Sequence, residues 1–390
     1  MSVGGPGHLL ALIRTRPHWT RRELLDATGM SRPTLLERLA PLFAAGLVHE
    51  AGPTRSEGGR PAQLIRFDDR SMVVLTFDVG HTRARVCYSG VHGRPLRSAS
   101  LALDLAARSP ASAVSVLTKT AADLGLRKGE RLIGVGVGLP APISPLTGLP
   151  SPSTVLPSFP AARMRGLWDV PVVFENDARA FALGSALSLA SGSEVSLASG
   201  SEVSLASGSE VSLASRSELS LASGSGGVAL GSEGVVLGVK WSSGIGAGVV
   251  VDGRCLTGAD GAAGDIGHIR VDPSGPLCRC GRRGCLAAFA AGYALQGASP
   301  VVAARRVGEV LASLIALVNP RTLVLGGSIG AQPAVVSTVD EVVRAVAMPH
   351  SVGELRVVAS PPETEAGTAG LVELVVRRVL SPDAVDALAL

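Results

Sequence analysis

Four residues of metal-binding type lie close together in the second half of the chain, and they restrict its possible fold more than any other feature. Cys278 and Cys280 form a Cys-x-Cys pair, Cys285 follows five residues later, and His268 precedes Cys278 by nine intervening residues. Three thiolates and one imidazole form a preferred tetrahedral ligand set for Zn²⁺. Because four protein ligands leave no position for substrate, we expect a structural zinc ion. The alternative is three buried cysteines placed together by chance.

The remaining composition indicates a globular cytoplasmic protein. The five cysteines are odd in number and unevenly spaced, which favours metal binding in a reducing compartment over a disulfide framework. We expect Cys87 and Cys255 to be core residues. No apolar run approaches the roughly 18 residues that cross a bilayer, and the stretch at 8–13 is too short for a signal peptide, so we expect no membrane insertion. A length of 390 residues, 46% of them hydrophobic, predicts two or three domains.

The positive charge lies at the N-terminus. The first 66 residues contain nine arginines and five acidic residues, which accounts for the whole net charge of +4. A basic module attached to a neutral body suggests binding to a polyanion.

The same segment shows the order of elements of a winged helix-turn-helix domain over residues 1–68. A capping box at 20–23, a tight turn at 28–30 and a cap at Ser31 predict three short helices within 8–50. The third helix should end at Gly46 and bury Leu35, Leu36, Leu39, Leu42 and Phe43. Strands at 47–50 and 62–67, joined by a turn at 52–59, predict the wing.

Polar side chains at the start of the third helix and near the tip of the wing are the expected DNA contacts. They are Ser31, Arg32, Thr34, Arg38, Arg55 and Arg60. Hydroxyl and guanidinium groups suit base edges and phosphates. A small helical dimerisation or docking domain with a solvated arginine face is the alternative. The coincidence of charge, helix order and wing favours DNA binding.

Four strand-and-turn elements follow in the body. A buried strand at 73–77 leads into Asp-Val-Gly-His-Thr at 78–82, and a strand at 172–174 leads into Glu-Asn-Asp-Ala at 175–178. A glycine-rich turn occupies 242–248, and Gly-Gly-Ser at 326–328 follows a strand at 323–325. Glycine-rich turns allow backbone amides to approach a phosphate.

Together with the histidine and cysteine motif and the Gly-Gly-Arg-Pro link at 58–61, these residues resemble the ROK family of repressors, open reading frames and sugar kinases. The likeness is to its winged-helix regulator branch, which includes N-acetylglucosamine and xylose repressors. It implies an α/β fold in which the winged helix precedes a two-lobed actin-like ATPase body at 71–390. One lobe would cover about 71–187 with a returning helix near 370–379, and the other about 228–365.

The resemblance also implies the site residues. It places zinc at His268, Cys278, Cys280 and Cys285, and a sugar at Asn176, Asp177, Asp265 and His268. It places phosphate or nucleotide at Asp78, Gly80, Thr82, Gly244 and Gly246. In an active kinase, Asp177 would be the general base, with ATP and Mg²⁺ as cofactors. From the residues alone, Asn176 and Asp177 also fit a strand-to-helix cap.

Several departures from the family pattern favour a sensor over a kinase. Asp265 and Ala287 each stand where a glutamate is usual. Asp265 is shorter than glutamate by one methylene, and Ala287 lacks the carboxylate. His81 replaces a glycine, and its side chain should crowd the phosphate turn. The Ser-Ser start of the second turn at 242–243 departs mildly from Gly-Thr.

The expected function is therefore a sugar-responsive transcriptional regulator, most simply a repressor. Its partners would be operator DNA and a sugar or sugar phosphate, and it would act as a homodimer or homotetramer. The alternative is an active ATP-dependent sugar kinase of the hexokinase type.

An octapeptide, Ser-Leu-Ala-Ser-Gly-Ser-Glu-Val, repeats through residues 188–225. Its serine and glycine content favours a surface loop that arose by tandem duplication, and we assign it no chemistry. The alternatives are a functional solenoid, or an insert that abolishes both roles of the protein.

Overall fold

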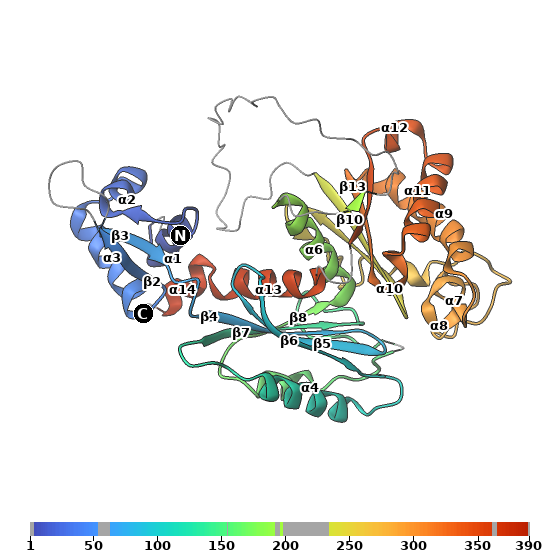
Figure 1. The fold of residues 1–390 in the computed structure, drawn as a ribbon, viewed down its shortest axis with the longest axis horizontal. Coiled ribbons are helices and arrows are strands. Elements are labelled where there is room, and N and C mark those ends of the chain that lie inside the picture. The colour runs from blue at the N-terminus through green and yellow to red at the C-terminus, as the bar shows by residue number, and fades with distance from the viewer. Residues whose placement is uncertain are drawn as a thin grey trace.

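The computed structural model describes residues 4–53, 63–153, 155–191, 196–197, 234–360 and 365–388. In these residues the chain forms three β-sheets, and helices cover the faces of the two larger ones (Figure 1). No helix in these ranges is long and apolar enough to cross a membrane.

The N-terminal unit contains three helices and a three-stranded antiparallel sheet of order β1-β3-β2. Its elements are α1 (Pro6–Ile13), β1 (Trp19–Thr20), α2 (Arg21–Thr28), α3 (Arg32–Ala44), β2 (Val48–Pro53) and β3 (Gln63–Phe67). The helices α2 and α3 begin where the sequence predicts, whereas α1 begins at Pro6, two residues before the expected range. Thr20 and Glu23 form a reciprocal capping box at α2, and the Ser31 hydroxyl caps α3. Gly46 ends α3 with a left-handed φ of 63°.

Two details of this unit differ from the sequence prediction. Leu36 is 52% exposed instead of buried. Leu35, Leu39 and Leu42 share one helix face, and one residue along the helix turns a side chain by about 100° away from it. The strand β1 was not predicted, because two residues are too short for any periodicity. Arg55, Arg60 and the link at 58–61 lie outside the described residues.

The first large sheet has five strands in the order β6-β5-β4-β7-β8. Its unit comprises β4 (Met72–Val79), β5 (Arg83–Gly90), β6 (Pro95–Ala102), α4 (Pro110–Leu124), β7 (Arg131–Leu139), α5 (Ala161–Arg165) and β8 (Val172–Asn176). Leu117 of α4 belongs to one apolar cluster with Leu75 and Val137 of the sheet. Both faces of the sheet are covered, which explains the continuous apolar run in β4.

The second large sheet has six strands in the order β12-β11-β10-β13-β14-β9. Its unit comprises β9 (Ser196–Leu197), β10 (Val235–Trp241), β11 (Ile245–Val251), β12 (Arg254–Cys255), η1 (Ile266–His268), α7 (Ala287–Ala290), α8 (Gly292–Leu295), α9 (Pro300–Val318), β13 (Thr322–Gly326), α10 (Gly327–Gly330), α11 (Pro333–Val346), α12 (Pro349–Val352) and β14 (Arg356–Ser360). Residues of α9 and α11 pack on one face of this sheet.

The two large sheets repeat one strand order. In each, a central strand, β4 or β10, begins an antiparallel run of three strands on one side and has two parallel strands on the other. The short β9 is an addition, which pairs antiparallel with β14 at the sheet edge. Consequently β4 and β10 are equivalent elements, and so are the turns that follow them.

Two helices, α6 (Asp177–Ala190) and α13 (Ala366–Val379), lie between the sheets (Figure 1). They cross at Gly184 and Gly370, where a Cβ on either glycine would overlap the backbone of the other helix. We expected α6 in the first lobe. It follows β8 directly, but its Ala178 and Ala182 pack on glycines of β10 and β11, so it contacts both sheets.

The octapeptide segment is described only in part. Its first residues, 188–190, continue α6, and Ser196–Leu197 forms β9. The other repeats lie outside the described residues.

The N-terminal unit is joined to the body through the C-terminal helices. A single apolar cluster contains Leu10 and Ile13 of α1 together with Val375 and Val376 of α13 and Val385 of α14 (Pro382–Leu388). Figure 1 shows α13 running from α14, beside α1, toward α6. The body and the N-terminal unit therefore share one core.

Polar contacts reinforce this junction. The backbone N–H of Gly7 donates to the Asp386 carboxylate at 2.7 Å. At the start of β7, the Arg131 guanidinium donates to the carbonyls of Ala45 and Gly46 at 2.7 and 3.4 Å, just after α3.

Candidate functional site

A cleft of about 1190 Å³ lies at the carboxyl ends of the central strands of both large sheets. This is where open α/β sheets usually bind ligands. Its lining includes every predicted sugar and phosphate residue: Asp78, Gly80, Thr82, Asn176, Asp177, Gly244, Gly246, Asp265 and His268. The structure thus brings these separate segments to one cavity.

Asn176 uses its side chain as a helix cap. Its Oδ1 accepts from the backbone N–H groups of Ala178 and Arg179 at 3.0 and 3.1 Å, and its Nδ2 donates to the Ala141 carbonyl at 3.2 Å. This is the cap that the residues alone also predicted. The neighbouring Asp177 carboxylate is 14% exposed and lines the cleft.

Asp177 and Asp78 share a cation that the sequence analysis missed. The Lys240 Nζ lies 3.1 Å from Oδ2 of Asp177 and 3.0 Å from Oδ1 of Asp78. Burial by itself lowers the pKa of the Lys240 ammonium, but Asp177 and then Asp78 outweigh it, so the pKa is raised. Lys240 is therefore charged, and it neutralises part of the acidic wall of the cleft.

A sequence signal for Lys240 exists. It is a charged residue in an otherwise apolar strand, and it is one of only three lysines in the chain. An isolated charge in a buried strand needs a partner of opposite charge.

His81 belongs to the turn after β4, and its ring reaches toward the equivalent turn after β10. Its Cε1 and Nε2 are 2.8 Å from the position that a Cβ would take on Gly244. Burial lowers the pKa of the imidazole, although the Asp177 carboxylate opposes this. Its Nδ1 is buried and finds no hydrogen-bond partner among the described residues. The sequence predicts that His81 crowds the phosphate turn in which it lies. The structure places its ring against the other turn, and the crowding of phosphate stays a prediction.

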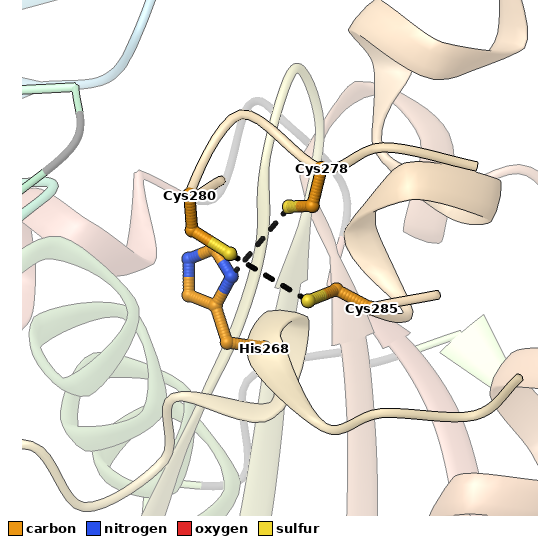
Figure 2. Close-up of side chains that lie close together, drawn as sticks. All are labelled: His268, Cys278, Cys280 and Cys285. Atoms are coloured by element: carbon orange, nitrogen blue, oxygen red, sulfur yellow. Dashed lines mark hydrogen bonds between the residues drawn. The ribbon is translucent and has the colours of Figure 1, made fainter. Parts of the chain in front are cut away.

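The side chains of His268, Cys278, Cys280 and Cys285 form a compact cluster in which the candidate ligand atoms all lie within 4.8 Å of one another (Figure 2). The Sγ atoms of Cys280 and Cys285 are 3.6 Å apart, and the Cys278 Sγ is 3.7 Å from the His268 Nδ1. Tetrahedral zinc with bonds of about 2.3 Å to sulfur separates two sulfur ligands by about 3.8 Å. The cluster can hold a metal ion of that size.

The backbone supports this arrangement. We call residues 278–285 the knuckle. The Cys278 N–H donates to the Arg282 carbonyl at 2.7 Å, and the Gly281 N–H donates to the Cys278 carbonyl at 2.9 Å. Gly284 has a φ of 74° and lies against the Asp272 carbonyl, where any side chain would overlap it. The turn is therefore tightly constrained beside the cleft.

A buried ion pair lies at the start of α6, and its arginine also contacts the second lobe. Arg179 of α6 donates through Nε to the Glu175 carboxylate at 2.8 Å and through a terminal nitrogen to the Gly261 carbonyl at 2.5 Å. Glu175 also accepts from the Asn176 N–H at 2.7 Å. These contacts fix the start of α6 against the loop of the second lobe.

The predicted DNA contacts that fall on described residues lie at the start of α3. Ser31 and Arg32 are exposed, and Thr34 and Arg38 are half-buried. The hydroxyls of Ser31 and Thr34 are 2.8 Å apart, so both take part in the helix cap.

Comparison with known proteins agrees with this geometry. A family model described as the ROK family matches residues 227–301 and 297–378. The chain carries a ROK family domain. The resemblance inferred from the sequence motifs is thereby confirmed.

Relatives of the ROK domain include both kinases and repressors. The N-acetylmannosamine kinase of Citrobacter koseri is 43% identical over 115 residues, covering 23% of this chain and 40% of that protein. The xylose repressor of Bacillus subtilis is 23% identical over 292 residues, covering 71% of this chain and 62% of that protein. The chain thus spans less than two thirds of the length of either relative.

One solved structure aligns over nearly the full length of this chain. A ROK family transcriptional regulator, described as a homolog of the E. coli MLC protein, aligns with a TM-score of 0.65 and 20% identity over 98% of each chain. At this identity the likeness shows a shared fold. The α/β architecture of this chain is therefore shared with that regulator.

Proposed function

We propose that this protein is a sugar-responsive transcriptional regulator, most simply a repressor that acts as a homodimer. It binds operator DNA through the N-terminal unit, a winged helix-turn-helix, and it binds a sugar in the cleft. The carrying observation is α13. One end of this helix lies at the cleft, where Gly367 packs against Asp78, and the other end shares a core with α1. The repressors among its relatives support this function.

The N-terminal unit suits DNA recognition. In a helix-turn-helix, the start of the second helix of the pair enters the major groove. In α3 that start carries the exposed Arg32 guanidinium, next to the cap formed by Ser31 and Thr34. Arg38, one to two turns further on, would reach phosphate or a base edge.

Ligand binding would act on DNA through the junction of the two parts. A sugar that closes the cleft moves the lobes against each other, and α13 moves with them because it packs on both β7 and α6. Arg131 of β7 and Asp386 of α14 bind the N-terminal unit, so it would move with them. The spacing of the two recognition helices in the dimer would then no longer match the half-sites.

Two contacts favour a sensor over a kinase. The Lys240 ammonium pairs with Asp177, the carboxylate that would have to accept a proton from a sugar hydroxyl. The His81 ring fills the space beside Gly244, between the two turns that would approach nucleotide phosphates. A sugar kinase is the second candidate, because Asp177 still lines the cleft together with Asp265 and His268.

We also propose that the metal is a structural Zn²⁺ bound by His268, Cys278, Cys280 and Cys285. A bound zinc ion supplies no reaction chemistry here. It would hold the knuckle in place beside the cleft, and His268 would give the ion one ring nitrogen while its ring borders the cleft.

The deciding experiment is fluorescence anisotropy of the zinc-loaded protein with DNA from its own upstream region, over a salt series and with a panel of sugars. We expect sequence-specific binding that one sugar weakens. Arg32→Ala should reduce the affinity about tenfold. Arg305→Ala removes the same charge from an exposed position on α9, far along the chain from the DNA-binding unit, and serves as the control.

Weak binding that depends steeply on salt and is indifferent to sequence and sugar would contradict the proposal. Sugar phosphorylation that disappears in Asp177→Asn would instead support the kinase.

A further inference from the structure

The exposed face of α3 is mostly apolar. The exposed residues of this helix are Arg32, Pro33, Leu36, Glu37, Ala40 and Ala44. A helix that faces water on one side normally carries charged and polar residues there. The opposite face of α3 is covered, because Leu35, Leu39 and Leu42 belong to the apolar cluster that the N-terminal unit shares with the body. The composition of the exposed face therefore indicates a surface that meets a partner.

Glu37 is one of only two charged residues on this face, and it differs from the other carboxylates of the N-terminal unit. In the described part of this unit, each of the others has a polar partner within 4.0 Å. These pairs are Glu23 with the Thr20 backbone N–H at 2.6 Å, Asp26 with Arg22 at 4.0 Å, and Glu50 with Arg21 at 2.7 Å. Glu37 makes no hydrogen bond or ion pair with any described residue.

The helix itself gives Glu37 no cation. Side chains three and four positions away along a helix are the ones that can reach it, and here they are Pro33, Thr34, Ala40 and Pro41. Glu37 also lies in the second turn of α3, whereas a carboxylate interacts favourably with the helix dipole in the first turn. Neither pairing within α3 nor the start of the helix accounts for this carboxylate.

A carboxylate on a DNA-binding surface opposes binding unless it contacts a base. The net charge of +4 on the first 66 residues attracts the phosphate backbone, and a negative charge among them repels the same phosphates. In the major groove, cytosine presents its N4 amino group as a donor, and a carboxylate can accept from it. Adenine also donates through N6, but its neighbouring N7 is an acceptor that an anion meets unfavourably.

We propose that α3 reads a cytosine of the operator through the Glu37 carboxylate. The inference rests on the proposed DNA-binding function and names a base that this surface recognises. Glu37 is the sixth of the 13 residues of α3, so it lies in the half of the helix that enters the groove. Its apolar neighbours Leu36 and Ala40 would exclude water from the contact, which strengthens the hydrogen bond. Glu37 is thus a specificity residue, while Arg32 supplies affinity.

The test is selection of binding sites from a random duplex library by the zinc-loaded full chain, without sugar. Fluorescence anisotropy then measures the affinity for the selected site. We expect a half-site with one position at which cytosine is required. Replacing that C·G pair by T·A in synthetic DNA should weaken the binding of the wild type about tenfold.

Variants of Glu37 assign this position to the carboxylate. Glu37→Gln keeps the size of the side chain, and because an amide pairs with N6 and N7 of adenine, the preferred base should change from cytosine to adenine. Glu37→Ala should select no base there. Both variants should bind unrelated DNA roughly threefold more tightly than the wild type, because the repulsion of phosphates is removed.

Asp26→Asn is the matched control. It removes one negative charge from an exposed position of α2 in the same unit, where the Asp26 side chain is 74% exposed. This variant should keep the cytosine preference of the wild type. Thermal melting of each variant establishes that the unit is folded, and we expect no loss of stability in Glu37→Gln, since the side chain is exposed and unpaired.

Three results would overturn the proposal and leave the proposed function intact. They are a selected site without a required cytosine, equal effects of Glu37→Gln and Asp26→Asn on base preference, and an altered oligomeric state of Glu37→Gln with unchanged base preference. The last result would assign this face to a contact between two copies of the chain. A wild-type protein that selects no sequence would contradict the proposed function itself, and this inference with it.

Discussion

The Lys240 ammonium lies 3.0 Å from Oδ1 of Asp78, and the two residues occupy equivalent positions in the two large sheets. Each is the penultimate residue of its strand, β4 for Asp78 and β10 for Lys240. Each is paired in register with a glycine of the adjacent parallel strand, Gly138 for Asp78 and Gly326 for Lys240. The repeated strand order of the lobes thus places opposite charges face to face. Asp177, the first residue of α6, completes the contact from the element between them.

Removing this cation should destabilise the protein substantially. Lys240→Gln leaves two mostly buried carboxylates facing each other, and we expect a loss of about 3 kcal/mol in the free energy of unfolding, measured by urea denaturation. Lys119→Gln is the matched control, because Lys119 and Asp123 form an ion pair whose side chains are 76% and 65% exposed. The control should change stability by less than about 0.5 kcal/mol. Equal losses in both variants would show that Lys240 makes no net contribution.

The four-residue cluster should bind one zinc ion per chain. Cys285→Ser removes one thiolate ligand, so zinc measured by mass spectrometry of the metal content should fall well below one equivalent, and the melting temperature should fall with it. Cys255→Ser changes a thiol outside the cluster and should retain full zinc. Wild-type protein that purifies without zinc and does not gain stability on its addition would contradict this prediction.

The other two thiols should be unreactive in the folded protein. Burial raises the pKa of Cys87, and burial raises the pKa of Cys255 to about 12. Because the thiolate is the nucleophile, iodoacetamide at pH 8 should label neither residue in the zinc-loaded protein. Peptide mass spectrometry should find both labelled after denaturation. Labelling of Cys255 in the native protein at the rate of a free thiol would show that its surroundings are open.

The buried His81 should make stability depend on pH. Burial lowers its pKa below the usual histidine value of about 6.5. The nearby Asp177 opposes this shift, whereas the charges of Arg279, Lys240 and His268 add to it. The unfolded chain therefore binds this proton more readily than the folded one. The stability that the neutral imidazole gives the folded protein is present above about pH 6.5, the usual pKa in the unfolded chain. It is lost as the pH falls below this value and through the lower pKa of the folded protein.

His81→Gln removes the titrating group, so its unfolding free energy should decline less than that of the wild type between pH 7.5 and pH 5.5. His350→Gln, at an exposed position after α11, is the control. An unchanged pH profile in His81→Gln would contradict the assignment.

The docking of the N-terminal unit should be sensitive to a single methyl group. A Cβ on Gly7 would overlap the backbone of Pro382, so Gly7→Ala should cost about 1–3 kcal/mol, seen as an early unfolding step in calorimetry and as weaker DNA binding. Gly90→Ala places a methyl group where no atom lies within 4 Å and should be nearly neutral.

Local patterns predicted much of the fold and the composition of the site. The cap at Ser31, the stop at Gly46 and the cysteine spacing depend on neighbouring residues, so they can be found without a structure. The zinc-type cluster needed one more distant member, His268. The preference of zinc for four ligands indicates it, and the family resemblance implies the same residue.

The missed features depend on contacts between distant segments. Lys240 meets Asp78 only because two similar sheets face each other, and β9 forms only because β14 offers a free edge. Arg279 and Arg282 line the cleft, but the sequence does not show which side of the knuckle borders a cavity. Leu36 was placed in the core because leucine content alone does not state which face of α3 is covered.

The crossing of α6 and α13 at Gly184 and Gly370 is a point about which α13 can pivot. From Gly370, the cleft end of α13 at Gly367 is about 4.5 Å away along the axis, and the end at Val376 in the shared core is about 9 Å away. A tilt of this rigid rod about the crossing would therefore move its far arm about twice as far as its near arm. A small displacement of Asp78 would therefore become a larger displacement at the N-terminal unit, and the helix would not need to bend.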